Sequence, residues 1–586
     1  MNLTNCSNSP YSRKRSPVVP MATRHFSFLY PTLIVVLLGF SFSMSLPHSE
    51  PIPPEIVCKS TPYPYLCTSM FLPNKPSNIF DYFQFSILRS VSTARELLYL
   101  VDQHLRNKSS LSKMAIRALD DCQLLAELNM DFLLSSFKTV NSTNTLPSFQ
   151  ADDVQSLLSA ILTNQETCLE GLKATPLAWN VKSGLYTLLS SGTMVYSVSL
   201  ALFTHGWVHE KNKAKLRRNL LFSPQYHHLP VTMWSKPNNQ AIYNYIGGRK
   251  LLQTTMRNII VRDTVVVRQD GKGNFSSIND AVSAAPNKTS INSGYFVIHV
   301  AAGVYGEYVS IDKNKMNIMM IGDGIQAYIK LYSINQSVIT GRSGNDGWTT
   351  FNSATFAVAG QGFVAVNITF RNTAGAIKGQ AVAVRNGADL STFYNCSFEG
   401  YQDTLYTHSL RQFYRECDIY GTVDFIFGNA AVVFQKCNIY GRLPIHGQSI
   451  TITAQGRSDL NQNTGTCVQE CNIKAASELA SSNASSTKTY LGRPWRQYSR
   501  TIFMQSFLDS FINPAGWTDW GDNTTLSTLY YAELNNTGPG SSTKNRVRWP
   551  GYHEINAKEA ANFSVSNFIH GDNWLPATRV PNIGGL

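Results

Sequence analysis

The chain has 586 residues, a formal net charge of +13 at pH 7 and only 15% charged residues. This length allows two or three domains, and an aromatic content of 11% excludes an intrinsically disordered chain. The excess of positive charge favours a polyanionic partner. Lys and Arg are scattered and no nucleic-acid-binding module is visible, so we do not expect that partner to be a nucleic acid.

Residues 1–50 are predicted to be a targeting segment. Four basic residues up to Arg24 precede the apolar run FSFLYPTLIVVLLGFSFSMSL at 26–46, the order typical of a secretory signal. The run is also just long enough for a membrane anchor, but Pro31 and its serines favour cleavage. Met21 is an alternative start to Met1. We therefore expect a secreted protein, with a transiently membrane-anchored precursor as the alternative.

In a secreted protein, cysteines can form disulfides and Asn-x-Ser/Thr sequons can be glycosylated. Of ten cysteines only Cys6 precedes the apolar run, and the other nine are candidates for disulfides. Several Asn-x-Ser/Thr sequons predict a glycoprotein, among them Asn107, Asn141, Asn274, Asn367, Asn395 and Asn562.

Residues 54–206 have the periodicity of helices. Ile87, Val91, Ala94, Leu98 and Val101 recur every three or four residues, which places them on one face of an amphipathic helix. Similar patterns run over 119–132, 154–172 and 185–202. Four such helices with short connections predict an up-and-down four-helix bundle.

Residues 207–260 are predicted to be a basic linker, because the stretch is irregular and rich in proline. It contains the dibasic pairs Arg217–Arg218 and Arg249–Lys250. Dibasic pairs in an exposed linker are candidate sites of proteolysis.

Residues 261–586 contain a repeat of about 20 residues. Cys396, Cys417 and Cys437 open the similar phrases CSFEGYQD, CDIYGTVD and CNIYGRLP, and such a period with one apolar strand per repeat is typical of a solenoid. In a parallel β-helix equivalent positions stack on successive coils. Asp403 and Asp424 would then be close neighbours, and Cys417 and Cys437 would lie within reach of a disulfide.

Five blocks in this region resemble, in order and spacing, the signature blocks of plant pectin methylesterases: GVYGEY (303–308), GQAVAVR (379–385), GYQDTLY (400–406), GTVDFIFGNA (421–430) and LGRPW (491–495). The resemblance implies a right-handed parallel β-helix that hydrolyses the methyl esters of homogalacturonan in cell-wall pectin, giving galacturonate and methanol. We expect a monomer in the cell wall that needs neither a metal nor another cofactor.

The helical region has a resemblance of its own. The spacing of Cys58, Cys67, Cys122 and Cys168, with TPYPYLC around the second cysteine, resembles the plant invertase and pectin methylesterase inhibitor domain. It implies the bridges Cys58–Cys67 and Cys122–Cys168 and a pro-region that restrains the esterase. A plain helical folding aid is the alternative, and a separate proteinaceous inhibitor is a further possible partner.

The linker also carries a family-like processing signal. The sequence formed by Arg249, Lys250, Leu251 and Leu252 resembles the site at which subtilisin-like proteases cut related pro-enzymes. We therefore expect a subtilisin-like processing protease as a partner.

The two aspartates suit ester hydrolysis. No GxSxG elbow is evident, so a serine mechanism lacks its usual frame. When two carboxyl groups are close, one stays charged while the other keeps its proton. The family match implies that Arg493 folds over Asp424, which makes Asp424 the nucleophile and leaves Asp403 as the acid and later the base.

The remaining site residues are polar donors and substrate contacts. Gln380 and Gln402 offer neutral N–H donors for a developing oxyanion, and Trp495 offers a flat apolar face for a sugar ring. The match adds Thr350 as a substrate contact, and we expect Gln380 and Arg493 to touch the substrate as well. The aromatic residues Tyr401, Tyr406 and Phe427 are open to two interpretations, cleft lining or packing of the β-helix.

Two other functions stay open at this point. Paired carboxylates on a β-helix also suit a polyuronate hydrolase or lyase, although a lyase would use a calcium-binding acid cluster and none is visible. The chain could also be a non-catalytic protein that binds pectin or acts through its helical domain. Intact Asp403, Asp424, Gln402 and Arg493 favour the esterase.

Overall fold

The computed structural model describes residues 52–71, 78–141, 145–175, 179–209, 259–323, 343–482, 487–521 and 523–586. The predicted targeting segment lies outside these residues. So does most of the predicted linker, including the processing candidates Arg249, Lys250, Leu251 and Leu252.

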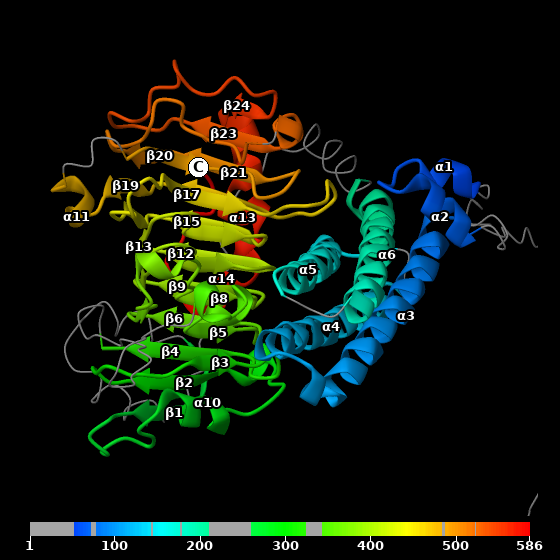
Figure 1. Ribbon diagram of the computed structural model, residues 1–586, viewed down its shortest axis with the longest axis horizontal. Helices are drawn as coiled ribbons and strands as arrows, with labels where there is room; N and C mark the ends of the chain where they lie inside the picture. Colours follow the sequence, from blue (N-terminus) through cyan, green and yellow to red (C-terminus); the bar gives the residue numbers. More distant parts are fainter. Residues whose placement is uncertain are drawn as a thin grey trace, which may run out of the picture. The chain divides into compact units, whose positions relative to one another are not determined.

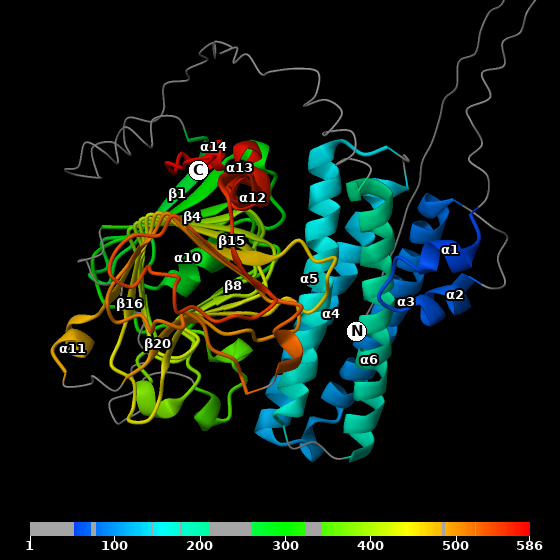
Figure 2. The same cartoon turned by 90° about the horizontal axis from the view of Figure 1, so that it is seen from above.

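The first described region is helical, as predicted (Figure 2). Two short helices, α1 (Pro54–Cys58) and α2 (Pro64–Phe71), precede four long ones: α3 (Ile79–Arg106), α4 (Lys113–Val140), α5 (Ser148–Lys173) and α6 (Trp179–Phe203). The long helices extend beyond the ranges predicted from apolar periodicity. The first turns of α3 and α4 begin at polar capping residues, which an apolar pattern does not detect. Asn78 accepts hydrogen bonds from the first backbone N–H groups of α3, and Ser112 does so at α4.

The apolar composition of α6 is explained by its burial within the protein. The segment Ser183–Val208 is long and apolar enough to cross a membrane, yet 61% of its most apolar window is buried within the protein. It continues as a π-helical segment (Thr204–His209), where Trp207 stacks on Phe203 at 5.0 Å between ring centroids. Helical structure therefore extends beyond the predicted boundary at residue 206.

Two disulfides tie this helical domain together, and both are those that the family resemblance implied. Cys58–Cys67 joins α1 to α2, and Cys122–Cys168 joins α4 to α5. The second closes a loop of 46 residues. Cross-links of this length stabilise a domain by restricting its unfolded chain.

The second region is a parallel β-helix of three sheets within the described residues, which confirms the predicted architecture (Figure 1). The largest sheet has the order β1 (Val261–Val267), β2 (Tyr295–Val300), β4 (Ile318–Gly322), β6 (Val364–Val366), β9 (Ser391–Tyr394), β12 (Arg411–Arg415), β15 (Ala431–Gln435), β18 (Gly465–Gln469), β21 (Arg500–Met504), β23 (Tyr530–Leu534) and β24 (Tyr552–Glu554).

The other two sheets complete each coil. One has the order β20 (Thr489–Gly492), β17 (Ile450–Gln455), β14 (Ile426–Gly428), β11 (Leu405–Thr407), β8 (Val384–Asn386), β5 (Phe356–Val358) and β3 (Val309–Ile311). The other has the order β22 (Phe507–Leu508), β19 (Asn472–Ala475), β16 (Asn438–Gly441), β13 (Asp418–Gly421), β10 (Ser397–Glu399) and β7 (Thr369–Arg371).

Identical positions stack inside the coils. Tyr414 pairs with Phe393 on one side and with Phe434 on the other, and the rings stack at centroid distances of 5.0 and 4.7 Å. All three side chains are fully buried. Such ladders of apolar side chains form the core and hold adjacent coils in one register.

The cysteines form a ladder too, but not the predicted bond. Cys396, Cys417, Cys437 and Cys471 precede the four consecutive strands β10, β13, β16 and β19, and all are buried free thiols. The strand spacing of about 4.8 Å lies within the Cα–Cα range of disulfides, so stacking on adjacent coils permits the bond but does not require it. The Cys417 thiol instead donates to the carbonyl oxygens of Phe393 and Arg415, so the structure lacks the predicted Cys417–Cys437 bridge.

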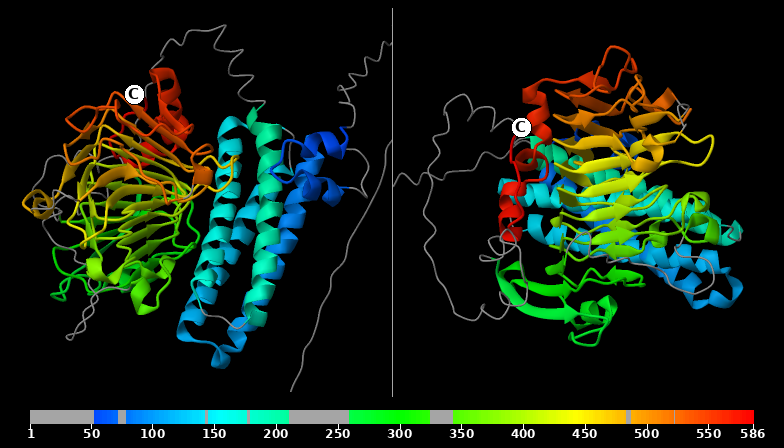
Figure 3. Two further views of the ribbon diagram at one scale, coloured as in Figure 1. Left: turned by 45° about the horizontal axis from the view of Figure 1, so that its top comes forward. Right: turned by 90° about the vertical axis from the view of Figure 1, so that its left-hand side faces the viewer.

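Short helices cover parts of the β-helix. α10 (Ile278–Ala284) buries Ile278, Ala281 and Val282 in the interior core, and α11 (Ser477–Ala480) follows β19. Three C-terminal helices, α12 (Ala557–Ala560), α13 (Val565–Phe568) and α14 (Leu575–Thr578), lie along the outer face of the largest sheet (Figure 3). Their apolar residues pack on side chains of β12, β15, β18 and β21.

A buried ion pair stabilises the last coils. Arg546 donates to both carboxylate oxygens of Glu533, at 2.7 and 3.1 Å, and its side chain is 1% exposed. Glu533 also accepts from the indole N–H of Trp517 and the hydroxyl of Tyr552. Removing one member of such a pair leaves an uncompensated charge in the interior.

We expect Arg546→Met to lower the free energy of unfolding by about 3–5 kcal/mol, because Glu533 stays charged and buried without its partner. The double variant Arg546→Met, Glu533→Gln should recover much of this loss, since the amide oxygen still accepts from Trp517 and Tyr552. Urea unfolding followed by circular dichroism compares them. Equal losses in both variants would contradict this expectation.

Candidate active site

The register of two adjacent coils brings the predicted acids together. Asp403 and Asp424 each stand two residues before paired positions of β11 and β14, where Leu405 lies beside Ile426. Both aspartates adopt left-handed backbone angles, with φ of 62° and 51°. Asp is among the few residues that tolerate this conformation, so the same tight turn recurs on both coils and presents both carboxyl groups at one place.

Asp424 is fixed from two sides. Arg493, directly after β20, donates from Nε to Oδ1 at 2.8 Å and from Nη2 to Oδ2 at 2.6 Å. Thr451, at the start of β17, donates its hydroxyl to Oδ1 at 2.6 Å and accepts from the Asp424 backbone N–H at 2.8 Å. A two-pronged contact with Arg is strong and directional, so Asp424 is held as an oriented carboxylate.

Asp403 lies in a different environment. Its side chain is 7% exposed, and within the described residues no protein group hydrogen bonds to its carboxyl oxygens. Burial raises the pKa of Asp403 well above its usual value, and the negative charge of Asp424 raises this pKa further, whereas Arg493 opposes the rise. Burial and the charge of Asp424 therefore both favour the protonated form of Asp403.

A cavity of about 720 Å³ lies over the two acids. Its floor contains every residue that the sequence predicted for catalysis or substrate binding: Gln380, Gln402, Asp403, Asp424, Arg493, Thr350 and Trp495. No other protein group in the described part of the chain hydrogen bonds to the side-chain amides of Gln380 and Gln402. Their N–H groups are thus available to a ligand beside the carboxyl pair.

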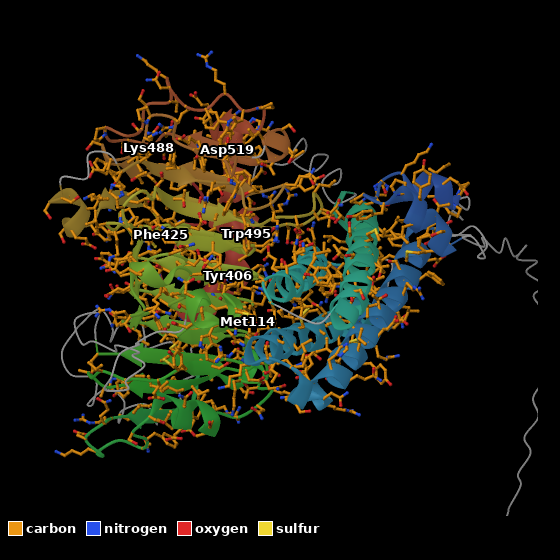
Figure 4. All side chains as sticks on the ribbon, viewed as in Figure 1. Met114, Tyr406, Phe425, Lys488, Trp495 and Asp519 are labelled. Atoms are coloured by element: carbon orange, nitrogen blue, oxygen red, sulfur yellow. A yellow bond between two sulfur atoms is a disulfide. The ribbon has the colours of Figure 1, made fainter. Side chains whose placement is uncertain are left out.

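Aromatic side chains line the same cavity. Tyr406 and Phe427 stack at 4.2 Å between ring centroids, and Trp495 packs at 6.4 and 5.9 Å from them. Figure 4 labels Tyr406 and Trp495 on this part of the β-helix. The two interpretations of Tyr406 and Phe427 are both correct, because the rings are almost fully buried and still face the cavity.

Comparison with protein families agrees with this geometry. The family model described as Pectinesterase matches residues 264–572. The chain belongs to the pectinesterase family. A second family model, Plant invertase/pectin methylesterase inhibitor, matches residues 54–202, so a pectinesterase domain follows an inhibitor domain in one chain.

Individual relatives match most of the chain, and a solved structure matches about half of it. The chain is 54% identical over 541 residues to "Probable pectinesterase/pectinesterase inhibitor 20" of Arabidopsis thaliana, covering 91% of this chain and 94% of the relative. It is 44% identical to "Pectinesterase 2" of Citrus sinensis, covering 94% and 99%. Among solved structures, the pectin methylesterase from carrot is 51% identical, with a TM-score of 0.52, and matches 55% of this chain and 98% of its own.

Helices α4 and α5 of the inhibitor domain complete the wall of the cavity. Met114 and Asp121 line it from α4, and Thr167, Glu170, Gly171 and Lys173 line it from α5. The carboxylate of Asp121 accepts hydrogen bonds from Thr349 and Asn352 of the pectinesterase domain. Burial raises the pKa of Asp121 to about 7, against the lowering effect of these hydrogen bonds and of Arg385.

Sequence reasoning missed Thr451 and Trp520. Thr451 lies 27 residues from Asp424, and it looks like any alternating strand residue until the coil register is known. Trp520 is 47% exposed, and the Arg493 guanidinium lies 3.5 Å from its ring centroid. A cation over an indole face is favourable, so Trp520 helps to hold Arg493 over Asp424.

The raised pKa of Asp403 predicts a pH-dependent stability. A carboxyl group whose folded-state pKa is raised contributes most below its unfolded value near 3.8, and this contribution is lost as the pH rises towards the folded value. Asp403→Asn removes that loss because an amide does not ionise. Each tenfold difference between the acid dissociation constants of the folded and unfolded states changes the free energy of unfolding by about 1.4 kcal/mol. We expect the variant to match the wild type near pH 4 and to be more stable at pH 7, in urea unfolding curves.

Asp424→Asn is the matched control, because it breaks the ion pair with Arg493 and should lower stability at pH 7. A destabilised Asp403→Asn at pH 7 would show that Asp403 is charged in the folded protein.

Proposed function

We propose that this chain hydrolyses the methyl esters of homogalacturonan in cell-wall pectin, releasing methanol and leaving galacturonate. Membership of the pectinesterase family supports the reaction class. The observation that carries the mechanism is the asymmetric pair in one cavity, Asp424 bound by Arg493 and Asp403 buried without a hydrogen-bond partner among the described residues.

Asp424 is the proposed nucleophile. Its carboxylate oxygen attacks the ester carbonyl carbon and forms a tetrahedral intermediate. The N–H groups of Gln380 and Gln402 donate to the oxygen on which negative charge develops. When the intermediate collapses, the ester C–O bond breaks, and the protonated Asp403 gives its proton to the leaving methanol.

The second half-reaction returns the enzyme to its first state. Water attacks the acyl group on Asp424, and the now charged Asp403 takes the proton of that water. The anhydride bond breaks, Asp424 becomes a carboxylate again, and the new carboxyl group of the product loses its proton to solvent as galacturonate leaves. Trp495 supplies an apolar face for the sugar ring, and Thr350 and Arg493 lie where they can contact the substrate.

The first test measures methanol release from highly methylated pectin by the wild-type chain after cleavage in the linker between 210 and 258. We expect Asp424→Asn to lose activity by at least about a thousandfold, because the nucleophile is gone. Asp403→Asn should lose about a hundred- to ten-thousandfold, the usual worth of a general acid. If the folded wild type bound pectin but released no methanol, the proposed esterase function would be wrong and a pectin-binding function would take its place.

Thr451 provides a second, finer test. Thr451→Val keeps the shape but loses a hydrogen bond to a charged oxygen, which is worth about 1.5–3 kcal/mol. We expect kcat to fall about 10- to 100-fold with KM little changed, since the substrate does not touch this side chain.

Thr451→Ser is the control and should keep most of the activity, because it retains the hydroxyl. If serine were as damaging as valine, packing of the methyl group rather than the hydrogen bond would be the cause.

The domain layout suggests a secreted precursor. Residues 1–50 would direct the chain to the cell wall, and residues 54–206 would restrain the esterase until a subtilisin-like protease cuts the linker. The contacts of α4 and α5 around the catalytic cavity support the restraint. The basic net charge of +13 suits binding to an anionic polyuronate.

A further inference from the structure

The inhibitor domain lines the same cavity as the two acids. Within the described residues, no hydrogen bond or ion pair joins this domain to Asp403, Asp424, Gln380, Gln402 or Arg493. Its polar contacts fall on other residues around the cavity instead. A domain that blocked the chemistry itself would have to occupy the nucleophile or the oxyanion donors.

Two of the rim contacts lie on either side of the acids along the seven-stranded sheet, in which β11 and β14 directly follow the acids. On the β5 side, Arg117 of α4 donates to the Gly347 carbonyl at 2.7 Å and lies 3.5 Å over the Trp348 ring. On the β20 side, Glu170 of α5 forms an ion pair with Arg496. These contacts hold the inhibitor domain against the pectinesterase domain on both sides of the acids along the stack of coils.

A third set of contacts lies just beyond the strands that directly follow the acids. Thr167 of α5 hydrogen bonds with His408, which follows β11, at 3.0 Å. Asn429, which follows β14, donates to Thr163 of the same helix at 2.9 Å. The helix α5 therefore lies against both coils at the carboxyl ends of their strands.

The remaining side reaches solvent. The cavity is also lined by Asn345, Lys173, Ala174 and Trp520, and all four are exposed. What remains around the acids is a chamber of about 720 Å³ with an opening to solvent. Cavities of roughly 300–1,000 Å³ hold drug-sized ligands, so one or two uronate rings fit.

We propose that the uncleaved chain is already an esterase, restricted by size to short methyl esters of uronates. The inhibitor domain excludes internal esters of the polymer, because a long chain must leave the site in two directions and the rim contacts hold the domain on both sides of the acids. A short ester enters through the open side and reacts by the same attack of Asp424 and the same proton transfer from Asp403. This inference rests on the proposed function and concerns the form in which the restraint acts.

The test compares the uncleaved chain with the cleaved enzyme. The uncleaved form carries Arg217→Ala, Arg218→Ala, Arg249→Ala and Lys250→Ala, and the cleaved form is the wild type cut in the linker and freed of its inhibitor domain. Both receive highly methylated pectin and, separately, the methyl esters of mono-, di- and trigalacturonate, and methanol is measured.

We expect the cleaved form to hydrolyse both kinds of substrate. The uncleaved form should hydrolyse the short esters within about tenfold of the cleaved rate and pectin at least about a hundredfold more slowly, since only access differs. Asp424→Asn in the uncleaved form should remove the short-ester activity.

Three results would overturn the proposal while the esterase stands. The uncleaved form could be silent on short esters that the cleaved form hydrolyses, it could hydrolyse pectin as fast as the cleaved form, or the cleaved form could require esters longer than the trimer. Failure of the cleaved form to release methanol from pectin would instead refute the proposed function, and this inference with it.

A chamber-filling variant tests the route directly. Met114→Trp on α4 adds bulk to the chamber but lies outside the pectinesterase domain. We expect it to cut short-ester hydrolysis by the uncleaved form at least about tenfold and to leave the cleaved form unchanged. Met114→Leu, which adds no bulk, should behave as the wild type.

Ala174→Trp narrows the same chamber from the end of α5 and should give the same loss. If one of these two variants gained activity on pectin, its inhibitor domain would no longer cover the cavity. The result of the other variant would then be the one that tests the proposal. Full short-ester activity in both docked variants would overturn the proposal.

Discussion

The in-register pairing of parallel coils is the constraint on which the site depends. Adjacent strands lie about 4.8 Å apart, and a repeat of about 20 residues places equivalent residues one above another. The aromatic ladder through Phe393, Tyr414 and Phe434 holds that register in the core. The same register sets Asp403 beside Asp424 at the base of the cavity, so the packing of the interior determines the geometry of the acids.

Two chemically identical residues differ because their neighbours differ. Asp424 accepts hydrogen bonds from the guanidinium of Arg493 and the hydroxyl of Thr451. Asp403 is buried beside the negative charge of Asp424, and both effects raise its pKa. An uncompensated buried carboxyl group costs stability, a cost that active sites often carry. The left-handed backbone at both aspartates is a further local strain at the same place.

The inhibitor domain adds a second layer of control without adding chemistry. Its polar contacts reach the rim at Gly347, Thr349, His408, Asn429 and Arg496 and leave the acids facing a chamber. An enzyme that acts on a polymer can be restrained by limiting access alone, because the polymer must extend beyond the site. Access and reactivity are therefore separable properties of this fold.

The sequence alone determined the helical domain, the coiled repeat, and the two acids with Gln380, Gln402 and Arg493, because periodicity and motif blocks are local properties. Contacts that neither the repeat nor the motif blocks implied were decided only by the tertiary structure. Thr451 became a partner of Asp424 through the coil register, and Asp121 met Thr349 across two domains. The predicted Cys417–Cys437 bridge was wrong, because both cysteines are buried free thiols and the Cys417 thiol donates to backbone carbonyl oxygens instead.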